Sequence, residues 1–361
     1  MEINLNIEPV SSWGVNATKP LMISGPCSAE TEEQVITTAK DLSALGIQIF
    51  RAGIWKPRTR PNQFEGVGSV GLKWMKTVKA ETGMLTATEV ANVKHVYEAL
   101  KMGIDVLWIG ARTSANPFAV QEIADALNGV DIPILVKNPI NPDLDLWIGA
   151  IERIAGAGIT KLAAIHRGFS SFEKSNFRNA PQWQITIELR KRMRNLPIIC
   201  DPSHIAGASD LVFEVAQKAM DLGQDGLIIE SHPNPRVALS DGKQQLTPKQ
   251  VGELMKNIQI RPEKTDNKDF TESLEELRSQ IDMIDDEILD TIQRRMAVVS
   301  QIGKTKKTNN VQILQTDRWI QIIESAKKKG DSKGLSGEFI EKLFKALHQE
   351  SINIQTKILN S

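Results

Sequence analysis

LMISGPCSAETEEQVITTAKDLSALGIQIFRAG, residues 21–53, contains the unit from which most of the chain is built. A short run of apolar, often β-branched residues ends in a polar residue, and a loop and a stretch with helical spacing lead to the next run. Such runs are typical of buried strands, and a helix between two of them makes the strands parallel neighbours. The segment therefore predicts an α/β fold.

The same unit recurs along about 240 residues, from Leu21 to Gln259. Eight apolar runs joined by helical segments over this length favour a closed (β/α)8 TIM barrel over an open doubly wound sheet. The expected strands lie in LMISGPC (21–27), IQIFRAG (47–53), MLTATEV (84–90), VLWIGAR (106–112), PILVKN (133–138), KLAAIHR (161–167), PIICDPS (197–203) and GLIIESH (226–232).

The bulk composition restricts the classes of function. Lys and Arg total 44, as do Asp and Glu, so no net field favours nucleic acid, and an anion must be bound by a local group of cations. Two cysteines, Cys27 and Cys200, are too few for a disulfide framework, which favours a reducing cytoplasm. The sequence shows neither a secretion signal nor an apolar run that could cross a bilayer. We therefore expect a cytoplasmic protein without a membrane partner.

Beyond Ile260 the pattern changes to helices alone. The polar segment 261–270 is expected to link a barrel domain, 1–260, to an all-helical domain, 271–361. One apolar seam at steps of three and four residues predicts a helix of about 35 residues, about 50 Å long. A break at 308–310, a helix over 316–329 and a last helix from Ser336 should follow. The seam consists of Leu274, Leu277, Ile281, Ile284, Ile288, Ile292, Met296 and Val299.

This seam also predicts an assembly. The roughly 55 residues that follow the long helix are too few to cover an apolar stripe of that length. We therefore expect the seam to pack against another copy of the chain, which gives a homodimer through the helical domain.

Four polar side chains at the ends of the expected strands have the chemistry of a metal site. In a TIM barrel the carboxyl ends of the strands meet at one rim, so residues distant in sequence come together there. A thiolate, an imidazole and two carboxylates suit a divalent transition ion such as Mn, Fe, Co or Zn better than Ca or Mg. The candidate ligands are Cys27, His204, Glu230 and Asp241; Cys200, inside its run, is expected to be core.

Cations gather at the same strand ends. Six positive charges on one rim repel one another unless they meet anions, and guanidinium groups bind phosphate and carboxylate through two parallel hydrogen bonds. The set therefore predicts a heavily anionic substrate. Its members are Arg51, Lys56, Arg58, Arg112, Lys137 and Arg167.

These motifs, in their order along the chain, resemble the 3-deoxy-D-arabino-heptulosonate 7-phosphate (DAHP) synthases. The resemblance covers nearly all of the first 250 residues and rests on GPCSAE, RAGIWKPRTRP, IGAR, LVKN, HRG, DPSHIAG, IIESHP and ALSDGKQ. KPRT, residues 56–59, is the discriminating piece, because the related eight-carbon sugar acid synthases, which use arabinose 5-phosphate, have an asparagine-containing motif there. A pentose phosphate substrate is the alternative that this motif disfavours.

The resemblance implies condensation of phosphoenolpyruvate with erythrose 4-phosphate to DAHP and phosphate. A divalent ion, Mn in the first place, would act as a Lewis acid on the aldehyde oxygen. Lys56 is expected to handle the proton at that oxygen, with a pKa lowered by the surrounding cations. The implied ligands are Cys27, His204, Glu230 and Asp241 for the metal; Arg51, Lys56, Arg112, Lys137 and Arg167 for phosphoenolpyruvate; and Arg58 and Thr59 for the tetrose phosphate.

In the helical region, several polar side chains share helix faces. Arg295 and Lys306 are eleven residues apart on the long helix, and Ser351 and Gln355 are four apart on the last one. By themselves, these spacings favour a solvated charged face over a buried anion site.

The segments LEELRSQIDMIDDEILDTIQRRMAVVSQIGKTK, TDRW and LHQESINIQ resemble the all-helical chorismate mutases. The pericyclic conversion of chorismate to prephenate needs neither nucleophile nor metal, only a folded substrate and stabilised charge. Trp319 and Gln315 stand where acidic residues are frequent in that family. The resemblance implies that Arg278, Arg295 and Arg318 bind the substrate carboxylates, with Arg278 reaching into the partner's pocket. It also implies that Lys306 and Gln355 contact the ether oxygen and that Ser351 lies in the pocket.

Two interpretations of the tail stay open at this stage. As an active mutase it could also regulate the barrel, with prephenate as the inhibitor. Alternatively, because of Trp319 and Gln315, it is a noncatalytic dimerisation and ligand-sensing domain.

Overall fold

The structure is a computed structural model that describes residues 2–16, 20–57, 63–172 and 175–360. The chain forms two compact units, Met1–Glu263 and Lys264–Ser361, and each is described by itself below. The division falls inside the segment 261–270 that the sequence indicates as a linker. None of the described helices is both long enough and apolar enough to cross a membrane.

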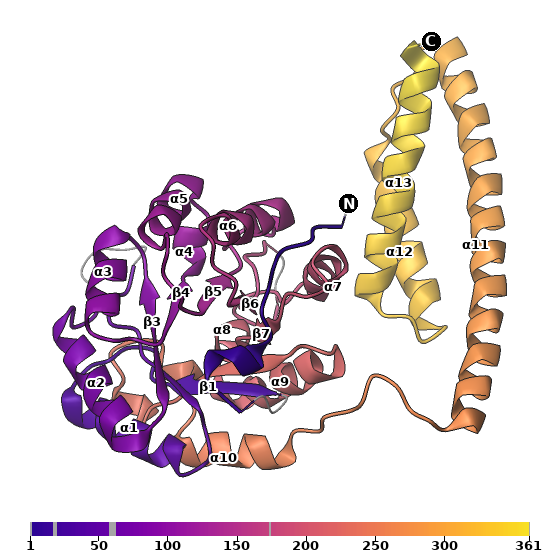
Figure 1. Ribbon diagram of the computed structural model, residues 1–361. Coiled ribbons are helices and arrows are strands. Elements are labelled where there is room, and N and C mark those ends of the chain that lie inside the picture. Colours follow the sequence, from indigo (N-terminus) through magenta and orange to yellow (C-terminus); the bar gives the residue numbers. More distant parts are fainter. Residues whose placement is uncertain (1, 17–19, 58–62, 173–174, 361) are drawn as a thin grey trace. The chain divides into compact units, whose positions relative to one another are not determined.

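The first unit is a closed barrel of eight parallel strands in chain order, with β1 pairing β8 (Figure 1). The predicted (β/α)8 barrel is thus confirmed, and each of the eight apolar runs contains one strand. The strands are β1 (Leu21–Gly25), β2 (Ile49–Arg51), β3 (Leu85–Val90), β4 (Val106–Ile109), β5 (Ile134–Lys137), β6 (Leu162–His166), β7 (Ile198–Cys200) and β8 (Gly226–Glu230).

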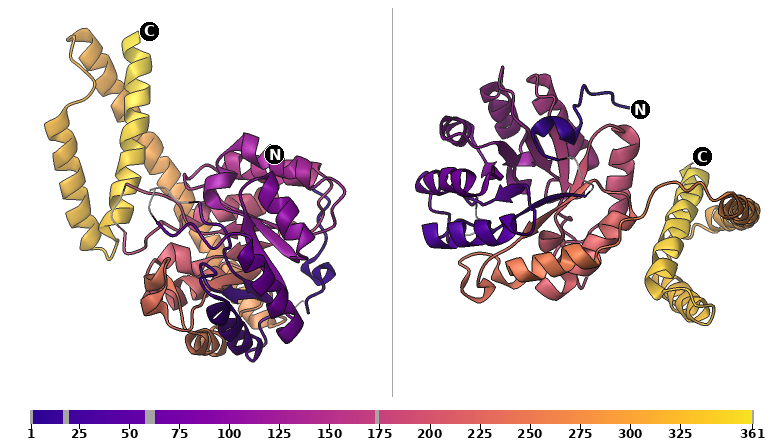
Figure 2. Two further views of the ribbon diagram at one scale, coloured as in Figure 1. Left: turned by 90° about the vertical axis from the view of Figure 1, so that its left-hand side faces the viewer. Right: turned by 60° about the horizontal axis from the view of Figure 1, so that its bottom comes forward.

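Helices surround the strands, as the right-hand view of Figure 2 shows. Several begin where a polar side chain caps the first turn; for example, Asn92 accepts a hydrogen bond from His95 N, and Asp143 accepts one from Leu146 N. The helices are α1 (Glu32–Ser43), α2 (Val70–Thr82), α3 (Val93–Lys101), α4 (Ala111–Ser114), α5 (Pro117–Ala126), α6 (Leu144–Gly156), α7 (Trp183–Arg192), α8 (Pro202–Ala206), α9 (Val212–Asp221) and α10 (Pro248–Asn257). Short 3₁₀ turns are η1 (Val10–Trp13), η2 (Ser209–Leu211), η3 (Pro235–Val237) and η4 (Gly242–Gln244).

The barrel has two apolar cores, one inside the ring of strands and one between strands and helices. Successive side chains of a strand point to opposite faces, so alternate residues supply each core. Cys200 belongs to the outer core and is fully buried, in agreement with its expected place in the core. The inner core includes Ile23, Ile49, Val106, Trp108, Leu135, Ile165, Ile199 and Ile228.

The second unit consists of three helices: α11 (Lys268–Thr308), α12 (Thr316–Asp331) and α13 (Gly337–Asn360). Helix α11 begins at Lys268 because the Asn267 side chain accepts a hydrogen bond from Phe270 N and caps the first turn. Its last turns pack closely on α13, where a Cβ atom on Gly303 would lie 3.1 Å from Ile358 Cδ1.

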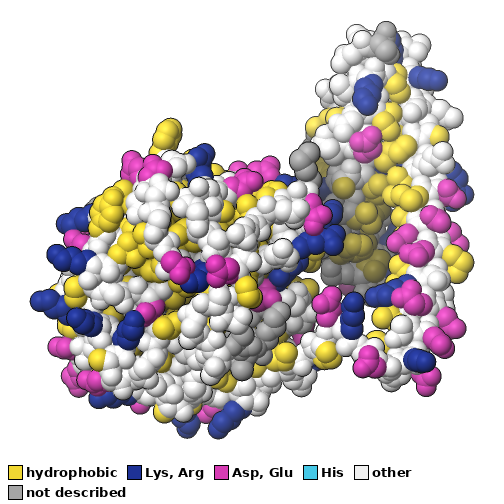
Figure 3. Space-filling view, in the orientation of Figure 1, with side chains coloured by type: hydrophobic (Ala, Val, Ile, Leu, Met, Phe, Trp, Pro, Cys, Tyr) yellow, Lys and Arg dark blue, Asp and Glu magenta, His cyan; other side chains and the backbone are white. Residues whose placement is uncertain are grey.

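Along the first two thirds of α11 the apolar seam is exposed. Leu277, Ile281, Ile284 and Ile288 each leave about half of their surface accessible in the single chain. Hydrophobic side chains accordingly lie among charged ones on the surface of this unit (Figure 3).

Candidate active site

The barrel register brings the predicted rim residues together. Four of them, Arg51, Lys137, Arg167 and Glu230, lie two positions beyond an inner-core residue, at or just after the end of a strand, so their side chains point toward the barrel axis at the carboxyl end. Sequence reasoning did not assign Asp201 to the site, although it has the same spacing. The pairs are Ile49 and Arg51, Leu135 and Lys137, Ile165 and Arg167, Ile199 and Asp201, and Ile228 and Glu230.

Three of the four predicted metal ligands form a tight group. One donor atom each of Cys27, Glu230 and Asp241 lies within 4.8 Å of the other two. Cys27 Sγ lies 3.3 Å from Asp241 Oδ2. His204 is placed beside this group, with Nε2 3.8 Å from Glu230 Oε1 and Nδ1 2.8 Å from Asp201 Oδ2. His204 therefore lies next to the group of three, on its Glu230 side.

Burial and neighbouring charges determine the pKa values of this group. Burial, reinforced by Glu230, raises the pKa of the Cys27 thiol to about 12. Burial opposes ionisation of Asp241 as well, yet His204 and Arg178 hold the pKa of its carboxyl well below the usual range. A thiol, an imidazole and two carboxylates in such proximity form a donor set suited to a divalent transition ion.

Basic side chains contact these same donors. Arg51 Nη1 donates to Glu230 Oε1 at 3.1 Å, and Lys56 Nζ lies 3.1 Å from Cys27 Sγ. The expected lowering of the Lys56 pKa is wrong: although burial opposes it, Cys27 and the carboxylates Glu89 and Glu230 raise the pKa. The barrel brings anions to this lysine as well as cations, and the anions prevail.

The other predicted cations also surround the inner face of the rim. Lys137 Nζ donates to Asp201 Oδ2 at 2.8 Å in a buried pair. Arg167 donates to Asn179 Oδ1 at 2.8 Å, and burial lowers its pKa to about 10. Arg112 lies in α4, directly after β4. The two expected tetrose phosphate contacts, Arg58 and Thr59, fall outside the described residues.

Trp108 is a site residue that sequence reasoning missed. Its ring centroid lies 4.7 Å from Arg51 Cζ and 5.9 Å from Lys137 Nζ, and its Nε1 donates to Glu89 Oε2 at 3.1 Å. The face of an indole attracts cations, so Trp108 helps to hold both basic groups in place inside the barrel.

A second polar group lies where α11 packs on α13. Arg295 Nη1 donates to Ser351 Oγ at 2.8 Å and to Leu347 O at 3.3 Å. Gln355 is buried, and its Oε1 has no hydrogen-bond partner among the described residues. Lys306 Nζ donates to Ile313 O at 2.5 Å. This group presents two cations and an unsatisfied amide.

Two predicted mutase residues lie apart from this group. Arg278 is exposed and forms an ion pair with Glu275. Because it is seventeen residues from Arg295 on the same helix, the two are about 25 Å apart along the axis. Arg318 is exposed on α12. Beside it, Trp319 stacks on His348 with 4.0 Å between ring centroids.

Comparison with known families agrees with this arrangement. The model described as the DAHP synthetase I family matches residues 12–264, which include the barrel and its rim. The chain belongs to the DAHP synthetase I family. This family is metal-dependent, and the Cys27, Glu230 and Asp241 group is a possible metal site. The model described as chorismate mutase type II matches residues 277–356, so both domains are present in one chain.

Individual relatives match the DAHP synthetase I domain. A phospho-2-dehydro-3-deoxyheptonate aldolase of Thermotoga maritima is 37% identical over 225 residues, 62% of this chain and 64% of its own length. A 2-dehydro-3-deoxyphosphooctonate aldolase of Desulfotalea psychrophila is 26% identical over 265 residues, 67% of this chain and 89% of the relative. A crystal structure of the Thermotoga maritima DAHP synthase has a TM-score of 0.60 at 34% identity, covering 66% of this chain and 67% of that one.

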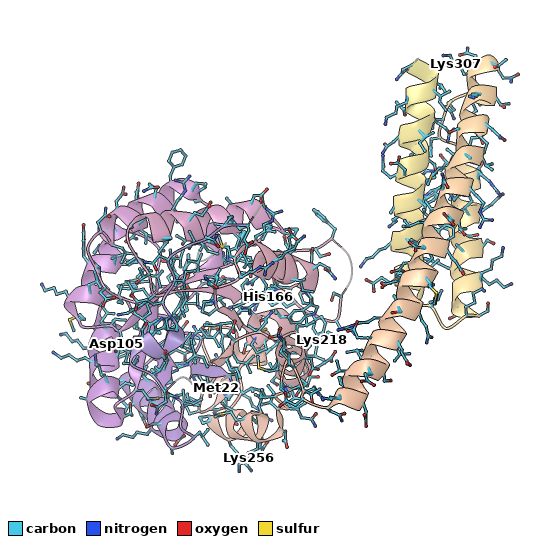
Figure 4. The ribbon with its side chains drawn as sticks, turned by 45° about the vertical axis from the view of Figure 1, so that its right-hand side comes forward. Met22, Asp105, His166, Lys218, Lys256 and Lys307 are labelled. Atoms are coloured by element: carbon cyan, nitrogen blue, oxygen red, sulfur yellow. The ribbon has the colours of Figure 1, made fainter. Side chains whose placement is uncertain are left out.

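His166, labelled in Figure 4, is the last residue of β6 and is completely buried. Nε2 contacts Pro181 O at 2.6 Å, the ring packs on Trp183, and Nδ1 has no partner among the described residues. Burial lowers its pKa to about 4, because a second ring proton would be enclosed without an acceptor.

Because the pKa of His166 is lowered in the folded chain, we expect the stability to depend on pH. An unfolded histidine titrates near 6.5, so the unfolded chain binds the proton first and stability is lost as the pH falls from about 6.5 to 4. The loss should be on the order of 3 kcal/mol. In His166→Gln, whose amide can still donate to Pro181 O, the free energy of unfolding should fall less over this interval. Denaturant unfolding at pH 7, 5.5 and 4.5 checks this, and parallel curves for the two proteins would refute it.

Proposed function

We propose that the chain is a bifunctional enzyme of the shikimate pathway. Residues 1–260 condense phosphoenolpyruvate with erythrose 4-phosphate to DAHP and phosphate, and residues 271–361 rearrange chorismate to prephenate. The observation that carries the first activity is the group of Cys27, Glu230 and Asp241 enclosed by basic side chains at the barrel rim. Both family matches support the pair of activities.

In the synthase, the basic side chains bind the anionic groups of phosphoenolpyruvate and hold the departing phosphate. Arg51, Lys137 and Arg167 point inward from three strands, and Arg112 and Lys56 complete the set. Arg58 and Thr59 are proposed to bind the tetrose phosphate. A divalent ion, Mn in the first place, would be held by Cys27, His204, Glu230 and Asp241 and would supply Lewis acidity toward the aldehyde oxygen.

Lys56 is proposed as the proton donor to that oxygen. Its raised pKa keeps the ammonium protonated at neutral pH, so it can deliver a proton as the new carbon–carbon bond forms. Nζ also lies 3.3 Å from Cys27 O, which holds the ammonium beside the proposed ligand group.

The identity of the sugar substrate is tested by comparing the rates with two sugar phosphates. With phosphoenolpyruvate in the full chain, erythrose 4-phosphate should release phosphate at a rate at least about 100-fold above arabinose 5-phosphate. A site whose polar groups pair with a four-carbon sugar phosphate leaves some of these groups unpaired when a five-carbon sugar phosphate binds. Equal rates, or a preference for the pentose, would replace this assignment with that of the eight-carbon sugar acid relatives.

In the mutase, Arg295 and Arg318 are proposed to bind carboxylates, and Lys306 and Gln355 to hydrogen-bond the ether oxygen. An ether oxygen only accepts hydrogen bonds, so Gln355 would donate from its buried Nε2, which in the free chain donates to Ser351 O at 3.3 Å. A noncatalytic, ligand-sensing tail is the second candidate, since Trp319 stacks on His348 where an acidic contact is frequent in the family.

The mutase domain is further proposed to regulate the synthase. Prephenate bound near Arg295 should lower the rate of phosphoenolpyruvate consumption by the full chain. Arg295→Ala should abolish this inhibition while keeping the uninhibited rate. Prephenate that binds without changing the synthase rate would contradict regulation.

Dimerisation through the seam of α11 is proposed from its exposure. About half of the surface of Ile284 and Ile288 is accessible in the single chain, and Arg278 is too far from Arg295 to share a pocket within one chain. Ile284→Asp should convert the dimer to a monomer in sedimentation experiments and lower mutase activity by about 100-fold, because a buried, unpaired charge is costly. Ser279→Asp adds the same charge on the opposite face and should stay dimeric. A dimeric Ile284→Asp variant would disprove this interface.

A further inference from the structure

Two residues outside the proposed ligand set link its two carboxylates. Gln244 is almost completely buried, and its Nε2 donates to Glu230 Oε2 at 2.7 Å. Its Oε1 accepts from Arg178 Nη1 at 2.8 Å. The same Arg178 nitrogen donates to Asp241 Oδ1, also at 2.8 Å. One amide and one guanidinium therefore connect a carboxylate at the end of β8 with one in the following loop.

The backbone holds this linkage in place. Arg178 N donates to Ala206 O, and a Cβ on Gly207 would lie only 2.3 Å from Arg178 Cβ, so the arginine packs where only glycine leaves room. Asp241 adopts φ 49°, a left-handed conformation that aspartate tolerates, and η4 begins directly after it and ends with Gln244. These contacts fix the backbone from which both linking side chains extend.

The linkage occupies one oxygen of each carboxylate and leaves the other facing the ligand group. Glu230 Oε1, which also accepts from Arg51 Nη1 at 3.1 Å, lies 3.8 Å from His204 Nε2, and Asp241 Oδ2 lies 3.3 Å from Cys27 Sγ. The oxygens held by Gln244 and Arg178 are the opposite ones, Oε2 and Oδ1. A carboxylate held in this way offers one oxygen to an ion rather than two.

We propose that Gln244 and Arg178 set the metal affinity and selectivity of this site by keeping both carboxylates one-oxygen donors. The inference rests on the proposed metal site. Few donors of mixed sulfur, nitrogen and oxygen type suit Mn, Fe, Co or Zn, whereas Ca²⁺ takes six to eight oxygens and often binds a carboxylate through both. Partners that orient metal ligands typically contribute a factor of about 10 to 100 in affinity.

Mn²⁺ binding to the metal-stripped full chain tests this, with free Mn²⁺ measured by electron paramagnetic resonance and Ca²⁺ as competitor. Gln244→Met and Arg178→Met should each weaken Mn²⁺ binding by about 10- to 100-fold and make Ca²⁺ a more effective competitor relative to Mn²⁺. The double variant should lose less than the product of the two factors, because both act through one linkage. Gln224→Met is the matched control: Gln224 is also buried, but its amide has no partner among the described residues.

The binding results distinguish failure of this inference from failure of the proposed metal site. Variants that bind Mn²⁺ within twofold of wild type would overturn the inference and leave the metal site intact. No Mn²⁺ binding by the wild type would overturn the metal site and the inference with it. Should Gln244→Met not fold, Arg178→Met decides, because the Arg178 side chain is 49% exposed and its replacement leaves no buried hole.

Discussion

Replacing Cys27 by alanine should reduce phosphoenolpyruvate consumption in the presence of erythrose 4-phosphate and Mn²⁺ by at least about a thousandfold. A metal ion contributes several kcal/mol to stabilising developing charge, and each 1.4 kcal/mol is a factor of ten in rate. Cys27 supplies the sulfur donor of the group, 3.3 Å from Asp241 Oδ2, and its loss also removes the sulfur that lies 3.1 Å from Lys56 Nζ. Stopped assays of phosphate release measure the effect.

The chain contains its own control for this variant. Cys200 is equally buried, but it belongs to the outer core between strands and helices. Cys200→Ala should therefore keep Mn²⁺ affinity and activity and change only the stability, by about 1 kcal/mol. Similar activity losses in both variants would indicate a general packing defect and contradict the ligand role of Cys27.

Replacing Arg295 by alanine should lower chorismate turnover by about 100- to 1,000-fold, the typical effect of removing one donor that stabilises developing charge. Arg295 is the cation that joins α11 to Ser351 on α13, where the unsatisfied amide of Gln355 also lies. Because the mutase reaction needs no metal, chelation should leave wild-type turnover unchanged. Absorbance of chorismate followed with and without chelator tests both expectations.

Arg294 provides the comparison. It precedes Arg295 in α11 but is exposed, and its guanidinium donates to the Thr291 hydroxyl one turn away. Arg294→Ala should keep full mutase activity. If the wild-type chain does not turn over chorismate at all, the tail is the noncatalytic sensor that Trp319 and Gln315 suggest.

The fold could be predicted from the sequence because strand and helix patterns are local. Period-two alternation fixes which side chains point inward, so Arg51, Lys137 and Glu230 had to meet once the barrel closed. The same reasoning would have found Asp201, which follows the inner residue Ile199 by two positions.

The rest of the site depends on loop geometry that no periodicity encodes. Arg178 and Gln244 reach the carboxylates through a left-handed residue and a close approach at Gly207. The pKa of Lys56 was predicted in the wrong direction because the sequence displays neighbouring cations, whereas the structure adds Cys27, Glu89 and Glu230.

The most direct test of the account is phosphate release from phosphoenolpyruvate and erythrose 4-phosphate by the purified full chain, before chelation, after chelation and after Mn²⁺ is restored. We predict activity that is lost on chelation and recovered with Mn²⁺. Persistent absence of phosphate release by the Mn²⁺-loaded chain would contradict the assignment of Cys27, His204, Glu230 and Asp241 to a catalytic metal site.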